Sequence, residues 1–203
     1  HTVISSVVQA MYAPWAANAA TKLQTLVRKF GYPGDRGKQL EAKYSDGTCL
    51  VFVDGLRYDT AKRLKELLEN EGLHVEEHPF WTTLPSNTIS GKAAVSPVSS
   101  LLDGSGEPKE FVPGVAGTDH SLKGGYHLRK LLLDSGWQIL EKQATGDVKG
   151  RAWCEVGNLD HEGHDRGWRL ALHVESLLKE IQGRVMALSE AGWSTIRIVS
   201  DHG

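Results

Sequence analysis

Three short apolar runs, each closed by an acidic residue, constrain the fold of this chain more than any other feature. They read "TCLVFVDG" (48–55), "RAWCEVGNLD" (151–160) and "STIRIVSDHG" (194–203). Runs of this length and composition are typical of buried parallel strands. Segments with apolar residues at helical spacing lie between them, the longest running from about residue 170 to 188. Strands that alternate with helices over long crossovers predict an α/β fold, with a mainly parallel sheet flanked by helices.

The rest of the chain predicts two parts of unequal size. Residues 1–35 carry apolar positions at helical spacing and form a helical lead-in, with Pro14 as an expected break or kink. Residues 36–203 form the main domain, in which the glycine-rich stretch 103–125 is expected to be a loop or insertion. The sequence "LHVEEH" (73–78) predicts a further, weaker strand.

Composition narrows the class of protein but says nothing of its chemistry. A net charge of −2 argues against a broad basic surface for nucleic acid, and no apolar run approaches the roughly 18 residues of a membrane span. Cys49 and Cys154 sit in apolar strand-like runs, so we expect buried thiols and a cytoplasmic protein. The chain opens on a histidine and stops where a strand has just finished, so we expect a fragment or an excised domain.

Acidic residues and histidines gather where the predicted strands end. Ligand sites in parallel sheets form outside the carboxyl ends of the strands, where Asp54, Asp160 and Asp201 are expected. His164 lies four residues after Asp160, and His202 directly follows Asp201. Each Asp alone would be a helix cap or turn residue, and an isolated Asp-His pair is mostly a surface feature. Three together, two of them with histidines, favour two sites for zinc or manganese.

Two similar patterns do not support a metal site. The sequence "HEGH" (161–164) is one residue short of the His-Glu-x-x-His spacing of zinc proteases. Asp119 and His120 follow a glycine-rich loop rather than a strand, so we expect them in solvent. The chain also has neither a Walker glycine loop nor a GxGxxG motif, which argues against the nucleotide-binding folds that carry them.

Three hydroxyls occur together in "LPSNTISGKAAVSP" (84–97), namely Ser86, Thr88 and Ser90. A hydroxyl at a helix N-terminus can be deprotonated by a metal ion, while nearby backbone N–H groups hold a phosphoryl oxygen. Thr88 stands at the start of a predicted helix and is the preferred nucleophile. Ser86 and Ser90 are the alternatives, and a capping role is the alternative for all three.

Four of these segments, in this order, resemble the PglZ domain, a member of the alkaline phosphatase superfamily. They are "VFVDGLRYD", "LPSNTISGKAAVSP", "GNLDHEGHDRG" and "IRIVSDHG", and "YAPW" (12–15) is similar to the helical lead-in of such proteins. The resemblance covers most of the chain. It implies an alkaline-phosphatase-like fold, here truncated at the C-terminus. PglZ proteins belong to bacterial and archaeal phage-defence systems of the BREX and phage-growth-limitation type.

The resemblance also implies roles for individual residues. One metal would be held by Asp54, Thr88, Asp201 and His202, with Thr88 as the nucleophile. The second would take Asp160, His164 and a further downstream histidine, which has no counterpart before Gly203. Arg57, in "DGLRYD", would contact phosphate or form a structural ion pair.

The activity that follows is that of a metal-dependent phosphatase or phosphodiesterase, with zinc as the expected metal and manganese as the alternative. Expected partners are a phosphorylated substrate or nucleic acid and other defence-system proteins, with no membrane. Two other functions remain open: a non-catalytic interaction module of a defence complex, and a phosphotransferase or mutase that uses the same site.

Overall fold

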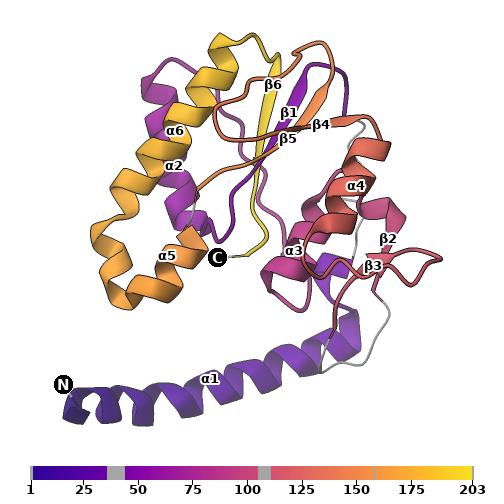
Figure 1. The fold of residues 1–203 in the computed structure, drawn as a ribbon. Helices are drawn as coiled ribbons and strands as arrows, with labels where there is room; N and C mark the ends of the chain where they lie inside the picture. The colour runs from indigo at the N-terminus through magenta and orange to yellow at the C-terminus, as the bar shows by residue number, and fades with distance from the viewer. Residues whose placement is uncertain (1, 36–43, 105–110, 158, 203) are drawn as a thin grey trace. The chain divides into compact units, whose positions relative to one another are not determined.

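The computed structural model describes residues 2–35, 44–104, 111–157 and 159–202 (Figure 1). The chain divides into two compact units, His1–Lys38 and Gln39–Gly203. The first contains helix α1 (Thr2–Phe30) and the short 3-10 turn η1 (Pro33–Asp35). The helix continues through Pro14, so of the predicted break or kink the break does not occur. A proline removes one backbone hydrogen bond, and here good helix formers such as Ala13, Ala16 and Ala17 surround it.

No helix in the described part of the chain is both long and apolar enough to cross a membrane. This holds for α1 as well, although many of its large apolar side chains are exposed.

The second unit is built on a parallel sheet of four strands in the order β4-β5-β1-β6 (Figure 1). The strands are β1 (Thr48–Phe52), β4 (Trp137–Leu140), β5 (Arg151–Glu155) and β6 (Thr195–Val199). In β1, Thr48 lies opposite both Arg151 and Thr195, so β5, β1 and β6 are in register at their first residues. The prediction of a mainly parallel sheet is confirmed.

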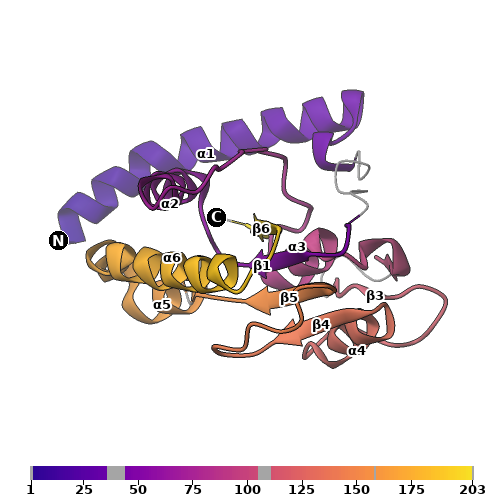
Figure 2. The same ribbon diagram turned by 90° about the horizontal axis from the view of Figure 1, so that it is seen from above.

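Helices cover both faces of this sheet (Figure 2). Alternate side chains of β1 enter different cores, because successive residues of a strand point to opposite faces. Cys49, Val51 and Val53 pack in a core with α2 (Tyr58–Asn70) and α6 (Val174–Glu190). Leu50 and Phe52 pack in a second core with α3 (Thr88–Val95) and α4 (Tyr126–Asp134). Two buried faces explain why β1 reads as a continuous apolar run rather than an alternating one.

The connections are shorter elements. Helix α5 (Leu159–Arg166) and the 3-10 segment η4 (Gly167–Leu172) follow β5. The 3-10 turn η3 (Ser99–Leu101) leads into β2 (Leu102–Asp103), which forms a small antiparallel pair with β3 (Gly114–Val115). This pair lies at the start of the stretch 103–125, which was predicted as a glycine-rich loop or insertion. Part of that stretch, 105–110, lies outside the described residues.

The predicted strand at 73–78 is not formed, so this prediction is wrong. Leu73 and Val75 pack against the first core, but the other four residues are histidines and glutamates. These charged and polar residues gain little from a half-buried pleated surface. The segment therefore packs against the first core as a loop and does not join the sheet.

The two cysteines are buried and free, as predicted. Both side chains belong to the core shared by α2 and α6, and the guanidinium of buried Arg184 lies beside them, with its Nε 3.4 Å from the Cys154 Sγ. Burial raises the pKa of the Cys49 thiol to about 12, and the neighbouring Cys154 adds to this shift. Such a thiol stays protonated and unreactive at neutral pH.

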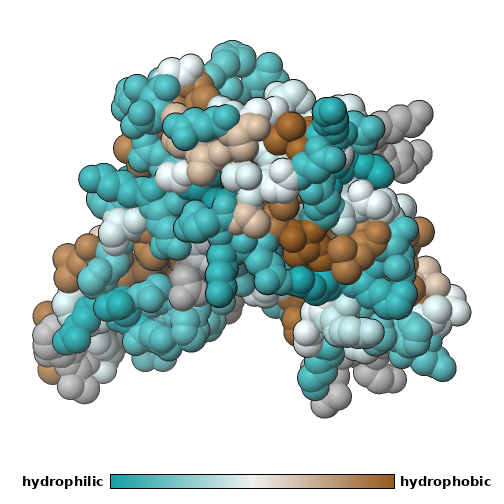
Figure 3. Space-filling model, turned by 45° about the horizontal axis from the view of Figure 1, so that its top comes forward, coloured by the Kyte–Doolittle hydropathy of each residue, from teal (hydrophilic) through white to brown (hydrophobic). Residues whose placement is uncertain are grey.

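The surface mixes polar and apolar groups. Figure 3 shows hydrophobic residues in several separate groups among hydrophilic ones on the face that it presents. Scattered apolar residues of this kind are normal for globular chains and need no special explanation.

Candidate metal centre

Three acidic residues follow the carboxyl ends of three neighbouring strands. Asp54 comes after β1, Asp201 comes after β6, and Asp160 lies in the first turn of α5, which follows β5. Because β1 lies between β5 and β6, these residues meet at one edge of the sheet. The main chain is tight here: a Cβ added at Gly55 would lie 3.1 Å from the Cβ of Asp160.

Asp54, Asp201 and His202 form a compact group of potential ligands. One atom from each lies within 4.8 Å of the others, and it is the one such group of three in the described part of the chain. The His202 Nε2 is 3.5 Å from Asp54 Oδ1 and 3.5 Å from Asp201 Oδ2. Two carboxylates and an imidazole at this separation suit a divalent ion such as zinc or manganese.

The two oxygens of the Asp201 carboxylate differ in their hydrogen bonds. Oδ1 accepts hydrogen bonds from the backbone N–H groups of Gly55 (3.2 Å) and His202 (2.9 Å). Oδ2 is buried, in a residue that is 1% exposed, and accepts no hydrogen bond from the residues that the structure describes. A buried oxygen without a partner is costly, and a cation placed beside it would remove that cost. The residues present therefore fit a bound metal ion.

The charge on Asp54 points the same way. The pKa of this carboxyl is raised from 3.8 to about 6. Burial is the largest cause, the nearby charges of Asp201 and Asp160 act in the same direction, and His202 and the Thr88 hydrogen bond act in the opposite direction. A divalent cation bound between partly buried carboxylates would offset the electrostatic repulsion between them.

Thr88 joins this group from the start of α3. The helix begins there because the Asn87 side chain caps it, accepting a hydrogen bond from the Ser90 N–H at 3.0 Å. The Thr88 hydroxyl donates to Asp54 Oδ1 at 3.2 Å and lies 3.1 Å from His202 Nε2. Of the two alternative hydroxyls, Ser86 is exposed to solvent, and the Ser90 Oγ is buried and has no hydrogen-bond partner among the described residues.

Four side chains from three separate segments thus converge on one place. No protein-family model, curated protein or solved structure matches this chain. What the site can do is therefore judged from its own contacts.

Two further residues position the group, and sequence reasoning missed both. A Cβ added at Gly91 would lie 2.5 Å from the Asp201 Cβ and 2.9 Å from the Asp201 backbone oxygen, so α3 approaches Asp201 this closely only with a glycine. The Thr82 hydroxyl donates to the same backbone oxygen. A lone glycine inside a predicted helix was the available signal for Gly91, whereas nothing in the sequence marks Thr82.

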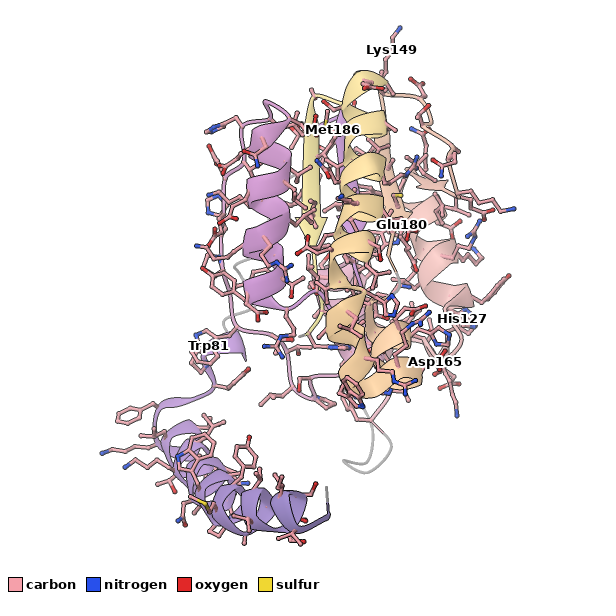
Figure 4. All side chains as sticks on the ribbon, turned by 90° about the vertical axis from the view of Figure 1, so that its left-hand side faces the viewer. Trp81, His127, Lys149, Asp165, Glu180 and Met186 are labelled. Atoms are coloured by element: carbon pink, nitrogen blue, oxygen red, sulfur yellow. The ribbon has the colours of Figure 1, made fainter. Side chains whose placement is uncertain are left out.

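The second predicted pair forms but stays incomplete. Asp160 Oδ2 and His164 Nε2 are 3.4 Å apart across one turn of α5, and the His164 side chain is 79% exposed. On the same helix, His161 and Asp165 form an equivalent pair at 3.2 Å, and Figure 4 labels Asp165 on this helix. In the described residues, neither pair belongs to a group of three ligands.

The remaining candidates lie in solvent. The Arg57 Nε and Nη2 both donate to the Asp59 carboxylate at 3.1 Å, and the Arg57 side chain is 68% exposed. This geometry corresponds to the structural ion pair rather than to a phosphate contact. Asp119 and His120 are exposed, and the His120 ring stacks on that of His127.

Two cavities adjoin the group. One, of about 420 Å³, is lined by Asp201 and His202 together with residues of α2 and of the segment 75–82. The other, of about 480 Å³, is lined by Thr88 and Lys92 on α3 and by residues around the start of α4. A ligand at the group of four side chains can therefore extend in two directions.

Proposed function

We propose that this chain is a metal-dependent hydrolase of phosphoric esters, with Thr88 as its nucleophile. The observation that carries the proposal is the position of the Thr88 hydroxyl, within hydrogen-bonding distance of both Asp54 and His202 and beside buried Asp201. The resemblance of four ordered segments to PglZ domains supports it, as does the parallel sheet with helices on both faces. An alkaline-phosphatase-like fold is part of this proposal.

Asp54, Asp201 and His202 would hold the metal, and the Thr88 oxygen would complete the set. Zinc is the expected ion because tetrahedral sites of oxygen and imidazole ligands suit it, and manganese is the alternative. When bound, a divalent ion lowers the pKa of an adjacent hydroxyl and stabilises negative charge on phosphoryl oxygens.

The residues of the chain carry out two steps. The Thr88 oxygen attacks phosphorus and forms a phosphothreonine, while the P–O bond to the ester group breaks and the released alcohol gains a proton. The Thr88 proton leaves towards Asp54 Oδ1, which already accepts the Thr88 hydrogen bond. Water then cleaves the phosphothreonine and restores the hydroxyl. Thr88 is the first residue of α3, and backbone N–H groups at this helix start would hold a phosphoryl oxygen.

Asp160 and His164 would contribute to a second metal position. In the part of the chain that the structure describes, these two residues offer two ligands and belong to no group of three. Two ligands alone bind a divalent ion weakly, so the first centre would carry the reaction.

The test combines metal content with hydrolysis. We expect protein purified without chelator to carry about one equivalent of zinc or manganese, and to cleave bis(p-nitrophenyl) phosphate or p-nitrophenyl phosphate. Thr88→Ala should keep the metal and lose cleavage, Thr88→Ser should keep part of it, and Ser86→Ala should behave as the parent. If Thr88→Ala cleaves both esters as fast as the parent, Thr88 is not the nucleophile.

A second candidate function is an interaction module in a phage-defence complex. The observation that favours it is the exposed Asp160–His164 pair, which looks no different from the surface pair beside it. Under either function, we propose a cytoplasmic role in bacterial or archaeal defence, with other defence-system proteins as partners. A folded Asp54→Ala protein that still supports full defence would favour the module. Transfer of phosphate to an acceptor other than water would indicate a phosphotransferase or mutase.

A further inference from the structure

The cavity of about 420 Å³ is continuous with the candidate centre. Asp201 and His202 form part of its wall, and the opposite walls come from α2 and from the segment 75–82. Its volume lies in the range of small-molecule sites. A phosphoester held by the centre would therefore have one of its ester groups next to this cavity, which we call the α2 cleft.

The α2 cleft has an apolar body and exposed aromatic rings at its wall. Buried Leu64 and Leu68 line it from α2. Phe80 and Trp81 line it from the facing segment, and they are 38% and 61% exposed. Figure 4 shows the Trp81 side chain at the surface of the molecule. Exposed rings beside a cleft can stack on a planar group of a ligand.

One end of the α2 cleft is polar and held in place. Glu77 Oε1 accepts a hydrogen bond from the Tyr58 hydroxyl at 2.5 Å and lies 3.3 Å from the Lys62 Nζ, while Lys65 is 3.8 Å from Glu77 Oε2. All four side chains line the cleft. Such a cluster offers both donors and acceptors to the edge of a ring. A phenyl or alkyl group would leave these groups unused, whereas a nucleobase has a stacking face and a hydrogen-bonding edge.

We propose that the α2 cleft binds the base of a nucleotide whose phosphate lies at Asp54, Asp201, His202 and Thr88. This inference rests on the proposed function, because it names the substrate class of the same site. The Thr82 hydroxyl bonds to the Asp201 backbone oxygen, so the segment that carries Trp81 is fixed to the centre. The distance between the stacking ring and the phosphate position is thereby set by the fold.

The second cavity is the natural control. It contains the exposed aromatic Tyr126 (67% exposed) and two cations, Lys92 and Arg129. Both cations are paired, as Lys62 and Lys65 are in the α2 cleft: Lys92 with Glu155 at 2.5 Å and Arg129 with Glu141. Tyr126→Ala removes an exposed ring that lies outside the α2 cleft, and it is therefore a match for Trp81→Ala.

The experiment measures binding without turnover. The parent background is the Thr88→Ala protein with one equivalent of zinc or manganese, and the probes are AMP and ribose 5-phosphate, which share a phosphate and a sugar but differ in the base. Affinities are measured by titration calorimetry. We expect AMP to bind about 5- to 150-fold more tightly than ribose 5-phosphate, the ratio that corresponds to about 1–3 kcal/mol for stacking of one base on an aromatic ring. Trp81→Ala should abolish this preference, while Trp81→Phe and Tyr126→Ala should retain it.

Three results would overturn the inference: equal affinities for the two probes, no binding of either at millimolar concentration, or a preference that survives Trp81→Ala and disappears in Tyr126→Ala. These results are separate from the fate of the proposed function. Thr88-dependent cleavage of bis(p-nitrophenyl) phosphate with equal affinities would leave the hydrolase standing and remove the base site. A base preference that depends on Trp81, without any Thr88-dependent cleavage, would support the base site and remove the hydrolase.

Discussion

The contact between Gly91 and Asp201 yields the sharpest prediction of stability. Replacing Gly91 by alanine places a methyl group 2.5 Å from the Asp201 Cβ, 2.9 Å from its backbone oxygen and 3.0 Å from its Cα. Two of these three atoms belong to the main chain and cannot rotate away, so α3 or the end of β6 must shift. Overpacking of a well-packed region costs about 1–3 kcal/mol.

Part of this cost is offset, because alanine is favoured over glycine inside a helix by about 0.8–1.0 kcal/mol. A matched control separates the two effects. Gly183 lies within α6 and is exposed, and a Cβ added there meets no atom within 4 Å. Gly183→Ala should therefore raise the free energy of unfolding by about 1 kcal/mol, the gain in helix propensity alone. The difference between the two variants should then equal the cost of the clash, about 1–3 kcal/mol.

The assay is urea unfolding of both variants and the parent, with metal removed, followed by metal titration. Because the clash falls on Asp201, a ligand of the proposed site, Gly91→Ala should also weaken metal binding, whereas Gly183→Ala should leave it unchanged. The reasoning is refuted if the two variants unfold at the same urea concentration and bind metal equally well.

Four further predictions concern the same region. In metal-free protein, the folded-state pKa of Asp54, about 6, lies above its ordinary 3.8, so the free energy of unfolding should fall as pH rises from about 4 to about 6. In urea unfolding, Asp54→Asn should be more stable than the parent at pH 7 and no different from it at pH 4. Thr82→Val removes the hydroxyl bonded to Asp201 and should cost about 0.5–1.5 kcal/mol in the same assay. Asn87→Ala removes the cap of α3 and should cost about 1 kcal/mol, whereas no change would mean that the cap does not hold this helix. A chelator should lower the melting temperature of the parent and leave that of Asp201→Asn unchanged, and an equal drop in both would exclude Asp201 as a ligand.

The strands and their acidic ends could be predicted because their signals are local. A run such as 49–53, apolar at every position, is typical of a strand buried on both faces, and the residue after it is then expected at the carboxyl edge of the sheet. The start of α3 could also be predicted from local sequence, because Thr88 follows Asn87, a residue that caps helices well.

What could not be predicted depends on contacts between distant residues. The segment 73–78 has the length of a strand, yet nothing within it indicates whether it pairs with the edge strand β6. The approach of Gly91 to Asp201 joins positions 110 residues apart, and so does the convergence of Thr88 with His202, 114 residues later in the chain. The break predicted at Pro14 did not occur for a local reason: the helix-breaking tendency of proline was outweighed by the good helix formers around it.

The two buried thiols supply a natural reporter of how often the core opens. Cys49 and Cys154 lie on neighbouring strands of the sheet, and the Cys49 thiol stays protonated under ordinary conditions. An alkylating reagent can reach them only when these strands separate, so the rate of labelling measures the population of the opened state. Because Asp54 and Asp201 follow β1 and its neighbour β6, an ion bound between them should slow that labelling. A thiol assay would thus detect metal binding without any knowledge of the substrate.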